Sequence, residues 1–534
     1  MLGAAAIAIS SLAAGCAVGP DFVRPAAPQA AAYATAPLPA QTAPADVAGG
    51  EAQRFVQGMD LPGQWWTLFH SQPLNDLVEQ ALNANPTLQV AEAALRQAME
   101  NVYAQQGFFL PAAQANFAAA RQRNAVGTVS PTLTSGVPLY NLYTTQVAVF
   151  YTADVFGGNR RQVESLSAQA ESQRFQLEAA YLTLTANVVA AAVQEASLRA
   201  QIEATEQVVK LEREALDLFR VRYNLGAIAL ADVVAQEALL AQTLATVPTL
   251  QKQLAQQRGL LTALLGRLPS EEPAEKFELS MLQLPEDLPV SLPGQLVEHR
   301  PDVRAAEAQL HAASAQIGVA TANMIPQITL SGAYGGTATQ FSQMFQAGNL
   351  FWSVSGNVAQ TLFAGGTLLH RKRAAIAAFD EAAAQYKSTV ITAFQNVADS
   401  LRALQYDADA LKAQLAAERA ALQSLEFARK GLELGSVSYL VVLTAQQAYQ
   451  QAVINLAQAR ANRFADTVAL FQALGGGWWN RADVAAAQSG FNPDVPAAAR
   501  CGRYDATGAA AMPWAPCGSD SRALDRPADP KVGE

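Results

Sequence analysis

The sequence is poor in the residues on which most enzymes and nucleic-acid-binding proteins rely. Its 534 residues include only 4 histidines and 3 cysteines, and charged residues make up 15%. No two histidines stand one helical turn apart, which is the spacing of a paired metal site. The net charge is −9, and no basic patch is interleaved with aromatic residues, so nucleic acid is not an expected partner. We expect no enzyme activity, no metal and no cofactor.

Long hydrophobic runs are also missing. After residue 20 no stretch offers about 18 uninterrupted apolar residues, so we expect no transmembrane helix. The start, MLGAAAIAISSLAAGC, is typical of a bacterial export signal, although it lacks a basic beginning and so leaves the true start of the signal open. Leu12 to Cys16 is similar to a lipobox, which predicts a lipid on Cys16; the alternative is an ordinary cleavage site with an incidental cysteine. Ala17, in place of an inner-membrane retention signal, favours the outer membrane.

The two remaining cysteines, Cys501 and Cys517, lie in an Ala/Pro-rich tail. In an oxidising periplasm they could form a disulfide that closes a loop of the tail. Two free thiols are an equally good interpretation.

Long helical patterns dominate the rest of the chain. Before a Leu-Gly break at Leu225, apolar or seam positions recur at alternating steps of four and three residues, the rhythm of a coiled coil: Leu198, Ile202, Thr205, Val209, Glu212, Leu216, Phe219 and Tyr223. A second series before Leu434 has the same rhythm: Leu411, Leu415, Glu418, Leu422, Leu425, Arg429 and Leu432. A helix from Arg160 to Tyr223 would be roughly 95 Å long, which suits a rod or the wall of a tube.

Segments of alternating polarity precede each long helix. The best is Tyr143 to Val155, and weaker ones are residues 113–125, 327–334 and 351–362. Aligned landmarks such as Leu110-Pro111 with Ile325-Pro326 show that the chain is a tandem repeat. We therefore divide it into a signal peptide (1–15), a lipidated extended leader (16–64), repeat 1 (65–266), a connector (267–292), repeat 2 (293–475) and a C-terminal tail (476–534).

Strands of this length suit a tilted crossing of a bilayer. Four strands cannot close a barrel, and open edges are not tolerated in lipid, so several chains must share one barrel. Three chains would supply twelve strands, and the helices would continue the bore as a duct.

The chain resembles the TolC-like outer-membrane efflux proteins, in particular their lipoprotein branch. The resemblance lies in CAVGPDF from Cys16, Trp65-Trp66, RPDVRAAE from Arg300, the Leu-Gly breaks and LLGRLP from Leu264. It runs from Cys16 to Trp479. It implies an α + β fold, with a periplasmic barrel of long coiled-coil helices and four transmembrane strands per chain in a shared trimeric barrel. It further implies a homotrimer that docks on a periplasmic adaptor and an inner-membrane pump and passes cargo outward.

The resemblance also suggests where the duct narrows. Carried onto this chain, the periplasmic aperture lies near Leu440 and Thr444; an ordinary seam position is the alternative for Leu440. Family members often have Asp at Thr444 or at Val441, so here we expect a Leu440 ring that closes by bulk. Asp232 matches a family Asp that helps to latch neighbouring helices shut. Its usual basic partner is replaced here by Val437. An acidic residue in a first helical turn, favoured by the helix dipole, is an equally good interpretation of Asp232.

The sequence leaves two alternative functions open. The same duct could serve type I protein secretion, because a wide duct need not recognise its cargo. A lipid-anchored coiled-coil scaffold without a pore would explain the heptads and Cys16, but not the four alternating segments.

Overall fold

The structure is a computed structural model that describes residues 17–28, 30, 32–33, 37–123, 139–482 and 484. The chain divides into two units, residues 1–481 and 482–534, and only residues 482 and 484 of the second are among those described. The expected signal peptide, the lipid-bearing Cys16 and the cysteines Cys501 and Cys517 therefore lie outside the described residues.

The first unit contains two repeats in which helices lead to two strands, a long helix and a return helix. The elements of the first are η1 (Trp65–Phe69), α2 (Gln72–Ala84), α3 (Pro86–Gln106), η2 (Gly107–Phe109), β2 (Ala112–Arg123), β3 (Leu139–Ala153), α4 (Gly158–Asn224) and α5 (Leu230–Leu264). The elements of the second are α6 (Pro293–His299), α7 (Pro301–Ala322), β5 (Gln327–Ala338), β6 (Leu350–Ala359), α8 (Thr367–Glu433) and α9 (Tyr439–Ala473). The predicted duplication and the α + β fold class are confirmed.

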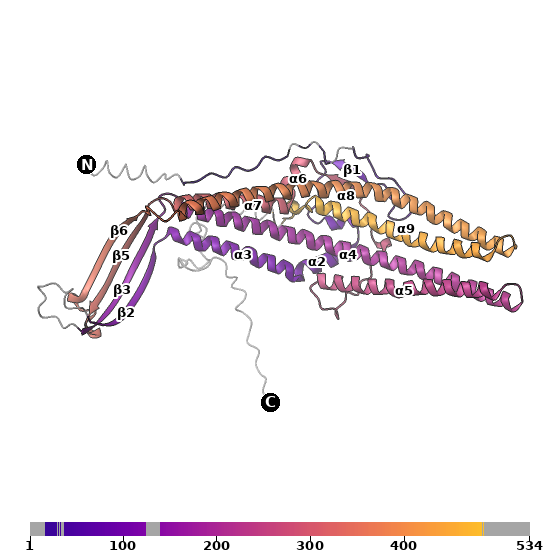
Figure 1. The fold of residues 1–534 in the computed structure, drawn as a ribbon, viewed down its shortest axis with the longest axis horizontal. Helices are drawn as coiled ribbons and strands as arrows, with labels where there is room; N and C mark the ends of the chain where they lie inside the picture. Colours follow the sequence, from indigo (N-terminus) through magenta and orange to yellow (C-terminus); the bar gives the residue numbers. More distant parts are fainter. Residues whose placement is uncertain are drawn as a thin grey trace, which may run out of the picture. The chain divides into compact units, whose positions relative to one another are not determined.

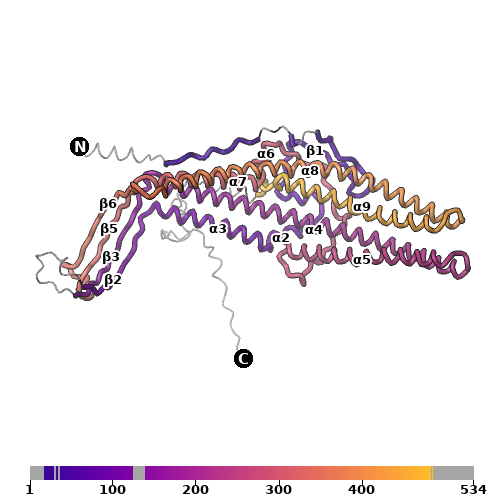
Figure 2. Tube along the Cα trace, in the orientation of Figure 1, coloured from indigo at the N-terminus to yellow at the C-terminus, as the bar shows by residue number. Residues whose placement is uncertain are grey.

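The two repeats match in helix length. α4 and α8 each span 67 residues, and α5 and α9 each span 35. α4 packs along α3, α5, α7 and α9, and α8 packs along α7 and α9, so the helices of both repeats run side by side (Figures 1 and 2). Most of the predicted seam is buried, as these residues show: Leu198, Thr205, Val209, Glu212, Leu216, Phe219, Leu411, Leu415 and Leu425.

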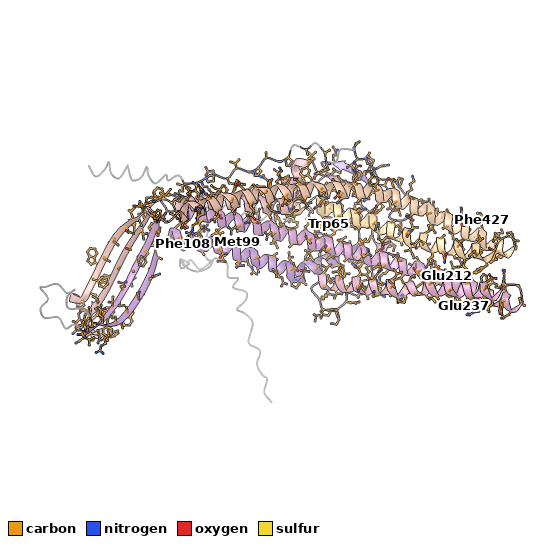
Figure 3. The ribbon with its side chains drawn as sticks, in the orientation of Figure 1. Trp65, Met99, Phe108, Glu212, Glu237 and Phe427 are labelled. Carbon is orange, nitrogen blue, oxygen red and sulfur yellow. The ribbon has the colours of Figure 1, made fainter. Side chains whose placement is uncertain are left out.

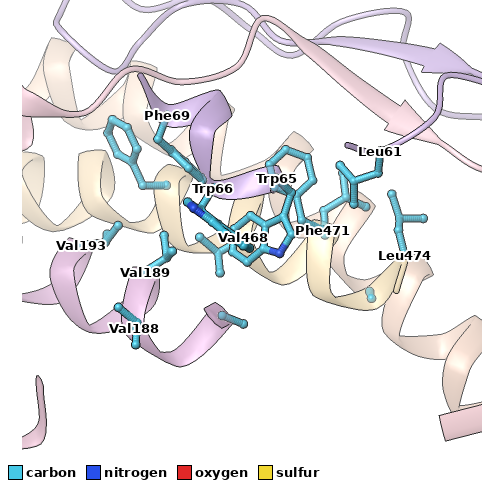
Figure 4. Packing of buried hydrophobic residues seen from close by; sticks show 14 of the residues in the cluster. Leu61, Trp65, Trp66, Phe69, Val188, Val189, Val193, Val468, Phe471 and Leu474 are labelled. Atoms are coloured by element: carbon cyan, nitrogen blue, oxygen red, sulfur yellow. The ribbon is translucent and has the colours of Figure 1, made fainter. Parts of the chain in front are cut away.

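An aromatic cluster joins the two repeats. Trp65 and Trp66 are each 1% exposed and Phe69 is fully buried. The Trp65 ring centroid lies 5.6 Å from that of Phe471 in α9, and Val189 of α4 is in the same cluster (Figure 4). Burying large aromatic side chains contributes strongly to stability, so the chain fastens repeat 1 to repeat 2 at the point where it enters the first repeat.

The four long strands form one antiparallel sheet in the order β2-β3-β5-β6. Within this chain β2 and β6 are edge strands, each with one side unpaired. The sheet extends from the ends of the helices where α4 and α8 begin (Figure 1). Each repeat thus contributes one pair of neighbouring strands, β2 with β3 and β5 with β6, as the two predicted strand pairs suggest.

One face of the sheet is apolar and the other is more polar. Val149 of β3 pairs with Gly332 of β5, which pairs with Val354 of β6, and these paired positions share a face. Val354 is 79% exposed and Val149 is 40% exposed. On the opposite face, the hydroxyls of Ser331 and Ser355 lie 2.7 Å apart in a hydrogen bond. The apolar face is suited to lipid and the other to a water-filled bore.

The leader is more ordered than its composition predicts. Its residues 54–57 form β1 (Arg54–Gln57), which pairs in parallel with β4 (Asp287–Val290) of the connector. Arg463 of α9 is fully buried beneath the leader. Its guanidinium donates to the carbonyl oxygens of Gly49 and Glu51, at 3.3 Å and 3.0 Å, and to other polar atoms of the leader. These bonds hold the leader against the second repeat.

Among the described residues, one helix, α4, has the length and apolar character of a membrane span. In its most apolar window 56% of the residues are buried inside the structure, and core helices pass the same test, so this is weak support for a span.

The assignment of the two faces of the sheet can be tested with Val149→Lys. A lysine on the lipid face should destabilise the assembled protein by about 2–4 kcal/mol near the bilayer midplane. Thr152→Lys, on the same strand but the opposite face, is the matched control and should cost far less. The heat stability of the oligomer band in reconstituted lipid would measure both. A larger loss of stability in Thr152→Lys than in Val149→Lys would mean that the faces are reversed.

Candidate functional site: the tip of the helical hairpins

The two hairpin turns lie at the end of the helices farthest from the sheet (Figure 1). Gly226 follows α4 with φ of 75°, and Gly435 follows α8 with φ of 71°. In each turn the glycine N–H and the next N–H bond back to carbonyl oxygens of the last helical turn. Only glycine adopts this left-handed conformation without strain, which is why a Leu-Gly pair ends both helices.

The first turns of α9 present two different faces. Tyr439 is buried, and its ring packs edge-on against Phe219 of α4 with centroids 4.1 Å apart. Leu440 and Val441 are 71% and 47% exposed. Thr444 is exposed too, and its hydroxyl donates to the Leu440 carbonyl at 2.9 Å. The three residues proposed for the aperture therefore share the side of α9 that this chain leaves uncovered.

Asp232 lies in the first turn of α5. Its carboxylate accepts a hydrogen bond from the Ala229 N–H at 3.2 Å, and its own N–H donates to the Ala229 carbonyl at 3.1 Å. An acidic side chain at this position also meets the positive end of the helix dipole. The contacts of Asp232 among the described residues thus help to begin its own helix.

A buried polar layer links the two hairpins above the tip. Glu212 of α4 is fully buried, and Thr243 of α5 donates to its Oε1 at 3.1 Å. Gln236 donates to the Glu212 carbonyl at 2.9 Å and accepts from the Tyr439 hydroxyl. Thr243 also donates to Gln450 of α9 at 3.3 Å. The layer joins α4, α5 and α9 (Figure 3 labels Glu212).

The polar layer is incompletely hydrogen-bonded. Glu212 Oε2 and both amide atoms of Gln446 are buried with no hydrogen-bond partner among the described residues. Burial raises the pKa of the Glu212 carboxyl above its ordinary value, and the bond from Thr243 offsets part of that rise. Burial, with the negative charges of Asp232 and Glu212, also raises the pKa of the Tyr439 phenol. The contact between the hairpins is therefore weaker than an apolar seam would be.

Glu212 is a predicted residue of the coiled-coil seam, but the heptad pattern does not reveal this layer. The available signal was a carboxylate at a core heptad position, which often fixes register at a cost in stability.

Over the described part of the chain, no group of three His, Cys, Asp or Glu could hold a metal ion. The exposed Leu440 and Val441 offer bulk without a reactive group, so the tip is suited to obstructing a passage.

Comparisons with known proteins agree with this architecture. The sequence profile described as outer membrane efflux protein matches residues 77–267 and 292–476. The toluene efflux pump outer membrane protein TtgF of Pseudomonas putida is 31% identical over 493 residues, which cover 89% of this chain and 96% of TtgF. The pyoverdine export outer membrane protein OpmQ, also of Pseudomonas putida, is 27% identical, with 83% of this chain and 94% of OpmQ covered.

A solved structure supports the same assignment. The outer-membrane channel OprN superposes with a TM-score of 0.77 at 29% sequence identity. The match covers 87% of this chain and all of OprN. An open sheet of membrane-length strands continued by long helical hairpins defines an outer-membrane channel.

More specifically, the chain belongs to the outer membrane efflux protein family. It lies in the outer membrane and forms the exit duct of a tripartite efflux system. The family consists of channels with no known enzymatic activity. The prediction that the chain forms a duct is confirmed, in preference to the alternative of a scaffold without a pore.

The buried carboxyl predicts a pH-dependent contact between the hairpins. Because the folded pKa of Glu212 lies above its unfolded value near 4.5, the stability that its protonated form contributes is lost as the pH rises through the folded pKa. We expect Glu212→Gln to flatten this decline and to be more stable than the wild type by about 1–3 kcal/mol near neutral pH. Thermal unfolding of the oligomer between about pH 4 and about pH 8 would measure it.

Glu237→Gln is the matched control for this experiment. Glu237 also lies on α5 at the tip, but its side chain is 44% exposed and pairs with Arg220. This control should keep the pH dependence of the wild type. Parallel pH profiles for the wild type and Glu212→Gln would exclude Glu212 as the titrating group.

Proposed function

We propose that the working duct is a homotrimer in which three four-stranded sheets close one twelve-stranded barrel. The observation that carries this proposal is the open sheet, whose edge strands β2 and β6 are 12 and 10 residues long. Their unpaired N–H and C=O groups could not face hydrocarbon, so β6 of one copy would pair with β2 of the next. α8 supports this arrangement, because it exposes Ile391 at 58% and Tyr406 at 60%, apolar surface that a neighbour would cover.

We propose that the tips dock on a periplasmic adaptor that connects the duct to an inner-membrane pump. Leu225 and Leu434, at the two turns, are 78% and 76% exposed. Such apolar side chains at the end of a rigid hairpin are suitable anchors for a partner. The cargo of the curated relatives supports small-molecule efflux over protein secretion, since TtgF is described as a toluene efflux protein and OpmQ as a pyoverdine exporter.

We propose that Leu440, with Val441 and Thr444 beside it, forms the narrowest ring of the duct. In a threefold ring, the exposed Leu440 side chains would meet on the axis and close the passage by bulk and dewetting. Asp232 belongs to the other hairpin of the tip and would influence opening through the start of α5.

This gate can be tested by planar-bilayer conductance of the purified oligomer. We expect a small wild-type conductance that rises several-fold in Leu440→Gly, because the substitution removes the obstructing side chain. Leu434→Gly is the control, since Leu434 is similarly exposed but lies at the turn. A large, equal conductance in the wild type and Leu440→Gly would move the gate elsewhere, and silence from both, with insertion shown, would contradict the duct.

We propose that Cys16 carries the lipid that pins the leader to the membrane. The first described residues of the leader lie at the junction of β3 and α4, where the Val18 N–H donates to the Phe156 carbonyl at 3.1 Å. The Arg161 guanidinium bonds to Asp21 at 2.6 Å. A lipid on the residue before Ala17 would thus be close to the level at which the strands end.

Cys16→Ser should abolish acylation, because the thiol is the acceptor of the lipid. Mass spectrometry of the mature protein should show the loss of the acyl mass in the variant and its presence in the wild type. An efflux assay of the same strains would show whether the lipid anchor is needed for efflux. A wild type without acyl mass would contradict the lipoprotein assignment.

A further inference from the structure

A run of three basic residues lies in the first turns of α8. Arg371, Lys372 and Arg373 follow His370 in consecutive positions, and the two arginines are exposed while the lysine is half-buried. Among the described residues none of these three cations takes part in an ion pair. The whole chain carries a net charge of −9, so this concentration of positive charge is local.

The equivalent start of α4 is charged differently. Arg160 pairs with Asp154 at 3.3 Å. Arg161 pairs with Asp21 at 2.6 Å and with Glu164 at 2.8 Å. α4 and α8 start 209 residues apart, at Gly158 and Thr367, so Arg373 stands where repeat 1 has Glu164. Over the residues that the structure describes, the first repeat therefore neutralises its arginines by ion pairs, and the second does not.

Helix stability does not account for the basic run. Cations in the first turns of a helix face the positive end of its dipole and weaken the helix. Three adjacent cations also repel one another. A local cost of this kind indicates that the charges serve an interaction outside the described fold.

Exposed apolar side chains precede the run in the sequence and also lie at the junction before β2. Leu362 and Phe363, in the loop from β6 to α8, are 92% and 88% exposed. Phe108 and Leu110, at the junction leading into β2, are 67% and 70% exposed (Figure 3 labels Phe108). Both junctions mark the end of the strands that cross the outer membrane, where hydrocarbon gives way to headgroups.

We propose that Arg371, Lys372 and Arg373, together with Leu362 and Phe363, bind anionic phospholipid of the periplasmic leaflet. The guanidinium groups match a lipid phosphate in charge and geometry, and the lysine adds a further positive charge. The two apolar side chains lie among the adjoining acyl chains. This combination fits a lipid better than a soluble anion, because a soluble anion has no acyl chains to contact the apolar residues. The inference rests on the membrane position of the sheet and not on the proposed gate or partners.

The test measures lipid binding to the full-length oligomer in detergent. Native mass spectrometry would count the phospholipids retained when dioleoyl phosphatidylglycerol or dioleoyl phosphatidylcholine is titrated in. Each cation near an anionic surface strengthens attraction about fivefold, so Arg371→Gln/Lys372→Gln/Arg373→Gln should weaken phosphatidylglycerol binding by up to about 100-fold. Lys387→Gln/Lys412→Gln/Lys430→Gln, which removes the same charge from exposed sites farther along α8, should leave it unchanged.

Several results would overturn the proposal. The wild type could bind both lipids equally, or the triple variant could keep the full preference for phosphatidylglycerol. Weaker oligomers in lipid-free detergent with unchanged lipid binding would assign the cations to carboxylates of a neighbouring copy. Equal binding of soluble glycerophosphate would exclude the apolar contribution. Arg371→Lys/Arg373→Lys, which keeps the charge and should keep the fold, must retain the preference for phosphatidylglycerol.

Discussion

The constraint on which the rest of this structure depends is that backbone N–H and C=O groups in hydrocarbon must be hydrogen-bonded within the protein. The sheet β2-β3-β5-β6 meets this requirement at its interior strands and fails it at both edges. The chain is therefore incomplete as a membrane structure by itself. The same sheet determines the position of the helices, because each strand pair passes directly into a helix of 67 residues. Membrane position, assembly and the direction of the duct all follow from this one requirement.

The helical part has a different task, which is to continue the duct from the sheet to the two hairpin turns, where the proposed gate lies. Midway along α4, the repeats are fastened by bulky apolar residues such as Trp65 and Phe471 (Figure 3 labels Trp65). Toward the tip, the contact is narrower and contains Glu212 and Gln446, whose polar atoms are only partly bonded. If the proposed gate opens, the weaker contact toward the tip is where the helices would separate first.

Most of the architecture was predictable from the sequence. Heptad spacing gave the long helices, alternation gave the strands, and the two Leu-Gly pairs gave the turns, because each of these patterns records a local geometric requirement. The pairing of β1 with β4 was not predictable, since it joins two short segments more than 200 residues apart whose compositions suggest irregular chain. The polar layer was equally hidden, because partners such as Glu212 and Thr243 meet only after two helices are docked. The role proposed for Leu440 at the aperture, by contrast, rests on the resemblance to a family, and the structure adds that its side chain is exposed.

The equal helix lengths of the two repeats have a further consequence for symmetry. α4 and α8, and likewise α5 and α9, start 209 residues apart, so the two turns of one chain are structurally equivalent ends. In the proposed trimer, six similar tips would form a ring with pseudo-sixfold symmetry. The ring would alternate chemically, because Leu440 and Thr444 correspond to Ala231 and Ala235 in the first repeat. Gene duplication would thus have produced a hexagonal rim in which only every second position can obstruct the passage.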